Sequence, residues 1–253
     1  MSMLDVAKEL GWSESKVSRL ETGQRPLSAE EIAAFLAVLR VTGEQRDRLM
    51  AMARTPDEPA WLDTIRSGLT GDSVTLATYE ADATAVTDWS PLLIPGLLQT
   101  MDYGRAYMLA DRIPETDIGV RLMARQHRQT ILDRVDYVAF IDEPVLRRRV
   151  GDERVRRNQL RHLLDMADHE RVAIRVVPVN SDAHSGLISP FMMLEFADAP
   201  PIVHIELPRS GVFMIDPSET DHFVGIRAQL LSRSLDEADS YRVIERILGE
   251  KGQ

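Results

Sequence analysis

Histidine, aspartate and glutamate are the residue types in this sequence that could act as a general base or hold a metal ion. Five histidines of the second half of the chain are candidates: His162, His169, His184, His204 and His222. None stands in an H-E-x-x-H arrangement, which would place two imidazoles and a carboxylate on one helical face for zinc hydrolysis. Asp182 and His184 are the best remaining pair, and a hydrogen bond within their glycine-containing loop is the favoured explanation.

Other catalytic patterns are missing from the sequence. It has no phosphate-binding loop, no G-x-G-x-x-G and no G-x-S-x-G. It has no cysteine, which excludes disulfides, thiol catalysis and cysteine-ligated zinc. We therefore expect a protein that is not an enzyme and that needs neither a metal nor another cofactor.

Arginine side chains form the most basic run of the chain. The run consists of Arg147, Arg148, Arg149, Arg154, Arg156, Arg157 and Arg161. It could be a second nucleic-acid surface, a site for a protein partner, or a set of cations paired with the carboxylates of an acidic domain. Charged runs on helices are usually solvated faces, so the structural interpretation is favoured.

Two short helices near the start of the chain must position a second group of polar residues. Leu4, Ala7 and Leu10 recur on one face of a helix that begins after Ser2. Gly11 follows, where a helix end commonly needs a left-handed residue.

The second helix is expected to begin at the capping candidate Ser13 and to end at Gly23. Val17 and Leu20 supply its buried stripe, and its opposite face is polar. Helix, short turn and helix with a polar outer face is the design of a protein segment that reads the DNA major groove.

The same stretch resembles the lambda-repressor-like, XRE-type helix-turn-helix, with the pattern L-x-x-x-A-x-x-L-G-x-S-x-x-x-[VI]-S-x-[LI]-E-x-G. The matching residues are Ala7, Leu10, Gly11, Ser13, Val17, Ser18, Leu20, Glu21 and Gly23, and Leu4 stands one place away from the first leucine of the pattern. The resemblance implies that a double-stranded DNA operator is contacted at its bases by Glu14, Ser15 and Arg19, and at its phosphates by Lys16, Thr22 and Arg25. Arg19 bonded to a guanine would contribute roughly 1–3 kcal/mol of base discrimination.

XRE-type domains have a further helix before this pair, and the sequence has no residues for it. We expect either that the true start lies upstream or that Leu4, Ala7 and Val17 form an uncovered apolar face. Such a face costs stability and attracts a partner.

The overall composition limits the class of protein. The 253 residues, 44% of them hydrophobic, suffice for two modest domains. No apolar run is long enough to span a bilayer and no signal-peptide pattern opens the chain, so we expect a cytoplasmic protein without membrane contact. The net charge is −10, but residues 1–55 carry eight Lys/Arg and eight Asp/Glu. DNA contact must then be local and modest in affinity per protomer, which favours a homodimer.

Capping signals and composition divide the chain. Two capping boxes, Ser28 to Glu31 and Thr42 to Gln45, open further helices of the first domain. The string R-T-P-D-E-P that begins at Arg54 has the composition of a linker. We predict a helix-turn-helix domain over residues 1–54, a linker over 55–60 and a second domain over 61–253.

The second domain mixes helical and strand patterns. Helices are expected over residues 61–68, 73–82, 99–110, 114–134, 143–149 and 152–170, and strands over 83–88, 135–141, 172–177, 191–196, 202–207 and 212–215. Two closing helices are expected to start at Ser218 and at Ser234. The predicted fold class is α+β: a small all-α domain followed by a larger mixed domain.

Residues 90–100, S-P-L-L-I-P-G-L-L-Q-T, form an apolar run that cannot be a helix interior, because it contains Pro91 and Pro95. We expect an extended, buried segment that ends in a turn at Pro95 and Gly96. It either fills the core or lines a pocket, and the first is favoured.

The second domain carries a further resemblance. L-I-P-G-L-L-Q-T-x-x-Y-x-R-A, V-L-R-R-R-V-G, V-V-P-V and S-G-L-I-S-P-F-M-M-L-E-F are similar to the C-terminal domain of a large actinobacterial regulator family. The family implies an antitoxin-like transcriptional regulator encoded beside a small partner protein. The candidate partner or ligand surface comprises Leu97, Gln99, Tyr103, Arg147, Arg148 and Arg149.

Three hypotheses of function follow. The first is a dimeric, sequence-specific regulator whose second domain receives a signal from a small protein or a ligand. The second is an antitoxin-like interaction module with a vestigial DNA-binding domain. The third is a small-molecule sensor with a pocket beneath Leu92 to Leu98.

Overall fold

A computed structural model describes residues 3–21, 29–52, 62, 69–207 and 210–250. The chain divides into two compact units at Asp57 and Glu58, and each unit is described by itself. The predicted linker and the helix expected over residues 61–68 lie outside the described residues, apart from Leu62, which is buried.

Unit 1 consists of helices. They are α1 (Met3–Leu10), α2 (Glu14–Glu21), α3 (Ala29–Val38) and α4 (Gly43–Met52). Gly11 ends α1 at φ +65°, with its own N–H bonded to the carbonyl of Lys8 and the N–H of Trp12 to that of Ala7. This is a Schellman motif, so the prediction for Gly11 is confirmed. Ser13 accepts the N–H of Lys16 at 3.3 Å, as expected of a cap.

The core of unit 1 corrects one expectation. Ala7 and Val17 are buried with Val6, and Phe35 of α3 packs against them, so these two residues are covered. Leu4 is 58% exposed and does not belong to that core. The buried face of α1 therefore consists of Val6 and Ala7 with Leu10 packed against them, so the predicted face is confirmed for Ala7 and Leu10 and wrong for Leu4.

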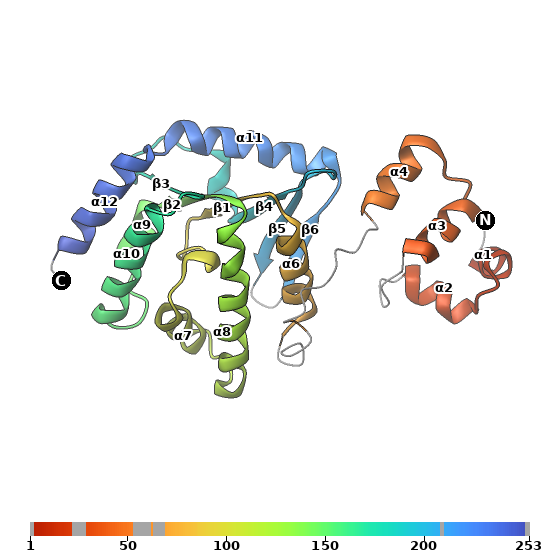
Figure 1. Ribbon diagram of the computed structural model, residues 1–253, viewed down its shortest axis with the longest axis horizontal. Coiled ribbons are helices and arrows are strands. Elements are labelled where there is room, and N and C mark those ends of the chain that lie inside the picture. Colours follow the sequence, from red (N-terminus) through yellow and green to blue (C-terminus); the bar gives the residue numbers. More distant parts are fainter. Residues whose placement is uncertain (1–2, 22–28, 53–61, 63–68, 208–209, 251–253) are drawn as a thin grey trace. The chain divides into compact units, whose positions relative to one another are not determined.

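Unit 2 is built on a six-stranded mixed sheet in the order β3-β2-β1-β4-β5-β6 (Figure 1). The strands are β1 (Ala85–Ser90), β2 (Asp136–Asp142), β3 (Val172–Val177), β4 (Phe191–Glu195), β5 (Ile202–Leu207) and β6 (Ser210–Met214). The first three are parallel, and β4, β5 and β6 continue the sheet with antiparallel pairing. The α+β class predicted from the sequence is confirmed.

Helices surround this sheet. They are α6 (Gly71–Asp82), α7 (Met101–Ala110), α8 (Glu115–Gln129), α9 (Glu143–Arg147), α10 (Glu153–Ala167), α11 (Pro217–Arg233) and α12 (Glu237–Gly249), with 3-10 turns η2 (Gly96–Leu98), η3 (Thr130–Asp133) and η4 (Ser185–Ile188). No helix of the described residues is long and apolar enough to cross a membrane.

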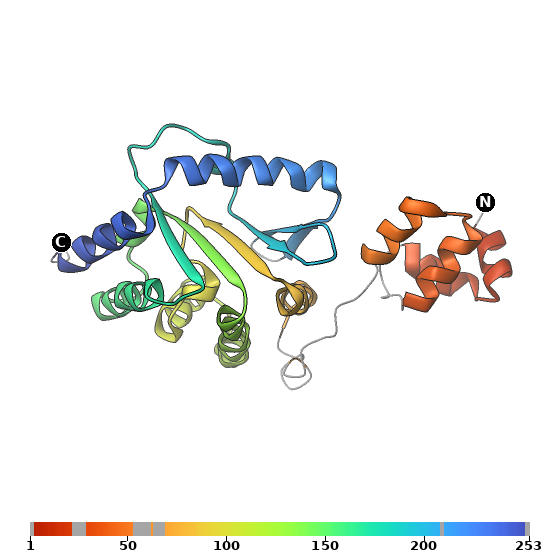
Figure 2. The same ribbon diagram turned by 45° about the horizontal axis from the view of Figure 1, so that its top comes forward.

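Both faces of the sheet are covered. Figure 2 shows α11 over one face and α6, α7, α8 and α10 over the other. Strand β2 explains why: Tyr137, Ala139 and Ile141 belong to the larger apolar cluster, whereas Phe140 belongs to the cluster that Phe223 of α11 completes. Successive side chains of a strand point to opposite faces, so a nearly continuous apolar strand needs helices on both.

Two predicted caps are wrong. Helix α11 is capped by Asp216, whose side chain accepts the N–H of Ser218, and not by Ser218 itself. Helix α12 is capped by Asp236 and not by Ser234, because Ser234 is the C-terminal cap of α11. The hydroxyl of Ser234 accepts the Nε–H of Arg175 at 3.0 Å.

Candidate functional site

The helix that should meet DNA presents a polar face in unit 1. Glu14 and Ser15, two of the predicted base-contacting residues, are exposed at the start of α2, and the hydroxyl of Ser15 lies 3.3 Å from that of Ser13. Arg19 lies in α2, but its side chain is outside the described part of the structure. Thr22 and Arg25, two of the predicted phosphate-contacting residues, lie wholly outside the described residues.

Lys16 is held by the protein itself. Its ammonium nitrogen lies 2.5 Å from a carboxylate oxygen of Glu31 in α3 and 3.9 Å from the ring centroid of Trp12. The Trp12 ring in turn stacks on Phe35, with centroids 6.5 Å apart. This side chain links α2 to α3 and to the turn between α1 and α2, a role that the sequence did not predict.

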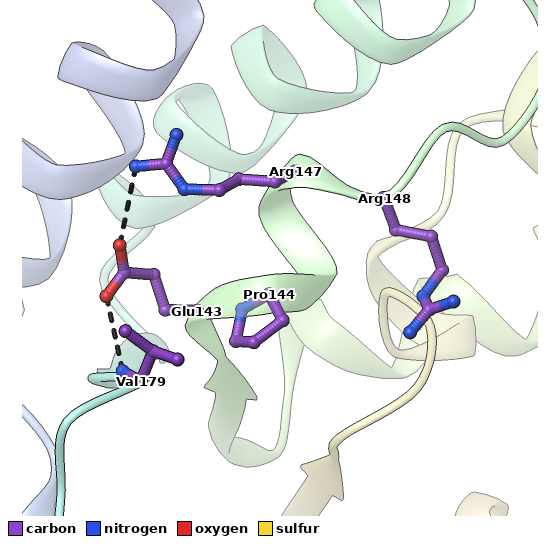
Figure 3. A pocket seen from close by; sticks show the side chains of 5 residues that line it. All are labelled: Glu143, Pro144, Arg147, Arg148 and Val179. Atoms are coloured by element: carbon purple, nitrogen blue, oxygen red, sulfur yellow. Dashed lines mark hydrogen bonds and ion pairs between the residues drawn. The ribbon is translucent and has the colours of Figure 1, made fainter.

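Unit 2 has a cleft at the end of its parallel strands. It measures about 430 Å³ and is lined by Glu143, Pro144, Arg147, Arg148 and Val179. Glu143 begins α9 directly after β2, and one of its carboxylate oxygens accepts the N–H of Val179 at 3.3 Å (Figure 3). In open sheets with parallel strands, ligands bind outside the carboxyl ends of those strands. This cleft lies beyond the ends of β2 and β3, and not between β1 and β4, where the strand order changes direction.

The three consecutive arginines are exposed, as expected of a surface. Arg147 forms ion pairs with Glu143, at 3.4 Å, and with Glu250 after α12. The guanidinium groups of Arg148 and Arg149 form no hydrogen bond or ion pair with any residue that the structure describes. Figure 3 shows Arg147 and Arg148 pointing in different directions from α9.

The later arginines of the run mostly have partners within unit 2. Arg154 pairs with Asp102, Arg156 with Glu153, and Arg157 donates to the carbonyl of Leu248. Arg161 donates to Asn158 at 3.1 Å. Pairing with carboxylates is therefore confirmed for Arg154 and Arg156, whereas Arg157 and Arg161 bind neutral oxygens.

Leu97, Gln99 and Tyr103 are not part of a surface, which corrects the predicted partner or ligand site. All three are buried, with exposed fractions of 1%, 4% and 2%. Gln99 donates to the carbonyl of Ile94 at 2.7 Å, and the Tyr103 hydroxyl accepts the N–H of Ile94 at 3.3 Å. Ile94, Leu97 and Leu98 also lie in the core, as the favoured interpretation of this segment predicts, whereas Leu92 is 57% exposed.

Arg125 of α8 also binds Gln99 and explains a glycine in α7. A Cβ atom placed on Gly104 would lie 2.8 Å from the Arg125 guanidinium, so a larger residue there would displace this guanidinium. Burial lowers the pKa of Arg125 to about 10.

A buried group of charged residues was not predicted from the sequence. Glu80 of α6 and Arg128 of α8 form a two-pronged ion pair, with both N–O distances at 2.7 Å. Burial by itself lowers the pKa of Arg128, and the facing Glu80 carboxylate outweighs it and raises the pKa above its ordinary value. On β1, Asp88 accepts the hydroxyls of Ser90, at 3.0 Å, and Tyr137, at 3.3 Å. Burial raises the pKa of Asp88 to about 7.

The histidines do not gather into a site. His184 is buried and its ring lies edge-on against Trp89, with 5.3 Å between the ring centroids. Within the described part of the chain, the expected hydrogen bond between His184 and the exposed Asp182 is not formed. His204 packs on Phe213 in the sheet, and burial lowers the pKa of both imidazoles. Within the described ranges, no three side chains of the metal-binding types come together.

Comparisons with known proteins agree with the two units. Residues 1–49 match a family described as a helix-turn-helix domain. No curated protein and no solved structure matches the chain. Residues 74–246, more than half of the chain, match a second family over most of unit 2. The chain therefore belongs to the family described as "Domain of unknown function (DUF5753)", here preceded by a helix-turn-helix domain.

Proposed function

We propose that this protein is a sequence-specific, DNA-binding transcriptional regulator that acts as a dimer in the cytoplasm. Unit 2 would receive a signal from a small partner protein or a ligand and would catalyse no reaction. The observation that carries the proposal is the helix-turn-helix match over residues 1–49, together with the polar, exposed start of α2 at Glu14 and Ser15. The XRE-type pattern and the actinobacterial, antitoxin-like family belong to the same proposal.

The chemistry of α2 supports reading of bases as well as attraction to phosphates. A serine hydroxyl bonds to either kind of base edge, and a carboxylate accepts from the amino group of cytosine. An arginine bonded to guanine through two hydrogen bonds is the commonest specific contact. Arg19, on the same helix, is the residue that we assign to this contact.

Substitution of Arg19 tests this assignment. Arg19→Ala is expected to weaken binding to the operator by about 5- to 150-fold, the equivalent of roughly 1–3 kcal/mol. Lys8→Ala is the matched control, because Lys8 is an exposed cation on α1 of the same unit. We expect Lys8→Ala to keep most of the affinity. Equal binding by wild-type protein and Arg19→Ala would refute the site assignment, provided that circular dichroism shows both folded.

A second candidate is an antitoxin-like interaction module with a vestigial DNA-binding domain. The contact of Lys16 with Glu31 favours it, because one of the predicted phosphate contacts is already neutralised inside unit 1. This candidate predicts stable capture of a partner protein and no protected region in a DNA footprint.

A further inference from the structure

The large apolar side chains most exposed in unit 2 lie at one edge of its sheet. Among the described residues these are Ile188 at 87%, Val179 at 70%, and Leu92 and Leu187 at 57% each. Leu92 follows β1, Val179 follows β3, and the other two directly precede β4.

The pairing of the strands places these segments at the same edge. Strands β1, β2 and β3 are parallel, so their carboxyl ends meet there. Strand β4 is antiparallel to β1, with Trp89 opposite Phe191, so β4 begins where β1 ends. A hydrogen bond of 2.7 Å from the indole of Trp89 to the carbonyl of Gly186 connects η4 to β1.

Basic side chains stand on this edge as well. Arg147 ends α9, which follows β2, and Arg148 is the C-terminal cap of this helix; both line the cleft, and Arg149 comes next in the chain. Arg147 forms ion pairs with Glu143 and Glu250, whereas Arg148 and Arg149 make no ion pair with a described residue. Since the chain carries a net charge of −10, this is a local excess of positive charge on an acidic protein.

We propose that this carboxyl edge, defined by Leu92, Arg147, Arg148, Val179 and Ile188, docks an extended acidic segment of a partner protein that also carries apolar side chains. The inference rests on the proposed function, because it names the surface through which unit 2 receives its signal. The apolar residues come from two connections, the one after β1 and the one between β3 and β4, and thus extend beyond the cleft. An extended segment can contact all of them at once.

The arrangement of the arginines favours such a segment over a small anion. A single carboxylate or phosphate is held best when several donors converge on it. Arg147 and Arg148 instead point away from one another (Figure 3). Two acidic side chains at separate positions of one peptide could each pair with one of these two arginines. Val179 lines the cleft with both arginines, and the other exposed apolar residues of this edge add the area that a purely ionic contact lacks.

Binding of synthetic peptides to the full chain tests the proposal. The probe is a fluorescein-labelled peptide of about twelve residues that mixes glutamate, leucine and serine. Two matched probes replace every glutamate by lysine or every leucine by serine. Fluorescence anisotropy is expected to show binding of the first peptide and at least about tenfold weaker binding of the other two. Equal binding of the lysine peptide, or of the peptide without leucine, would overturn the proposal.

Variants locate the binding site. Arg148→Glu and Ile188→Ser are each expected to lower the affinity for the acidic, leucine-containing peptide by about tenfold or more. Arg105→Glu and Leu109→Ser are the controls, because both residues are exposed on α7. Loss of binding in the controls alone, or in none of the variants, would refute the location.

The same variants separate this inference from the proposed function. Arg148→Glu and Ile188→Ser should bind DNA as the wild-type protein does. If wild-type protein binds the peptide but no DNA, the proposed function fails and the docking edge stands. If it binds DNA but no peptide, the docking edge alone fails.

Discussion

The ammonium group of Lys16 lies 2.5 Å from the carboxylate of Glu31, so α2 and α3 are joined by an ion pair. Both side chains are about four-fifths buried, with exposed fractions of 22% and 19%. A lysine in this position stabilises the packing of α2 on α3, whereas the resemblance assigns it to a phosphate contact. The two roles differ in a measurable way.

Substitution of Lys16 by methionine distinguishes them. A lost phosphate contact lowers the slope of log K against log salt concentration by about 0.9. We predict an unchanged slope for Lys16→Met and a loss of about 1 kcal/mol in the free energy of unfolding, because the ion pair and the contact with Trp12 disappear. Lys8→Met serves as the control. A slope reduced by about one unit would return Lys16 to the phosphate contacts.

The ion pair between Glu80 and Arg128 is predicted to be indispensable for the stability of unit 2. Arg128→Met leaves the fully buried Glu80 carboxylate without its cation. Removal of one partner from a buried pair costs about 3–5 kcal/mol, and urea unfolding at neutral pH should show it. The double variant Glu80→Gln with Arg128→Met should recover part of that loss. A double variant less stable than Arg128→Met would contradict this explanation.

Asp88 is predicted to make the stability of unit 2 depend on pH. Its pKa is raised to about 7 in the folded protein, so the folded state binds a proton that the unfolded state releases near pH 4. The contribution to stability is complete below pH 4 and is lost as pH rises toward 7, at about 1.4 kcal/mol per pH unit. Asp88→Asn should therefore gain stability relative to wild-type protein between pH 5 and pH 8. The same difference between the two proteins at both pH values would show that Asp88 does not titrate in this range.

Arg112 offers a test of backbone strain. It ends α7 with φ +59°, in a Schellman motif where the N–H of Ile113 binds the carbonyl of Met108. A non-glycine residue in this left-handed conformation costs about 1–2 kcal/mol, and glycine removes that cost while adding entropy to the unfolded chain. We expect Arg112→Gly to raise the free energy of unfolding by about 0.5–1 kcal/mol. A destabilised variant would mean that the arginine side chain contributes more than its backbone conformation costs.

Local patterns sufficed for much of the fold because their causes are local. Gly11 was predicted from the need for a left-handed residue at a helix end, and β2 from a run of apolar residues too continuous for a strand with a solvated face. The sequence also contains a local signal for the cap at Asp216. Proline favours the first position of a helix, so Pro217 indicates that the capping residue is the one before it.

The polar groups inside unit 2 lacked such a signal. The Ser234 hydroxyl accepts a hydrogen bond from Arg175, 59 residues away in sequence. Glu80 and Arg128 are 48 residues apart, and Asp88 and Tyr137 are 49 apart. Only the folded chain brings these partners together, so periodicity could not predict them. The same reason explains why Gln99, placed on a surface by its motif, is a buried connector.

Selection of binding sites from random DNA tests the central claim most directly. Full-length protein is incubated with a library of double-stranded DNA, randomised over about 30 base pairs, at about 150 mM salt, and bound molecules are sequenced over several rounds. The proposal predicts that one sequence is enriched, with two symmetric half-sites about one helical turn apart, and that Arg19→Ala loses the preference at one position of each half-site. Binding without any enriched sequence, by protein that is folded and retains its affinity for the acidic peptide, would contradict the proposal that this chain reads DNA.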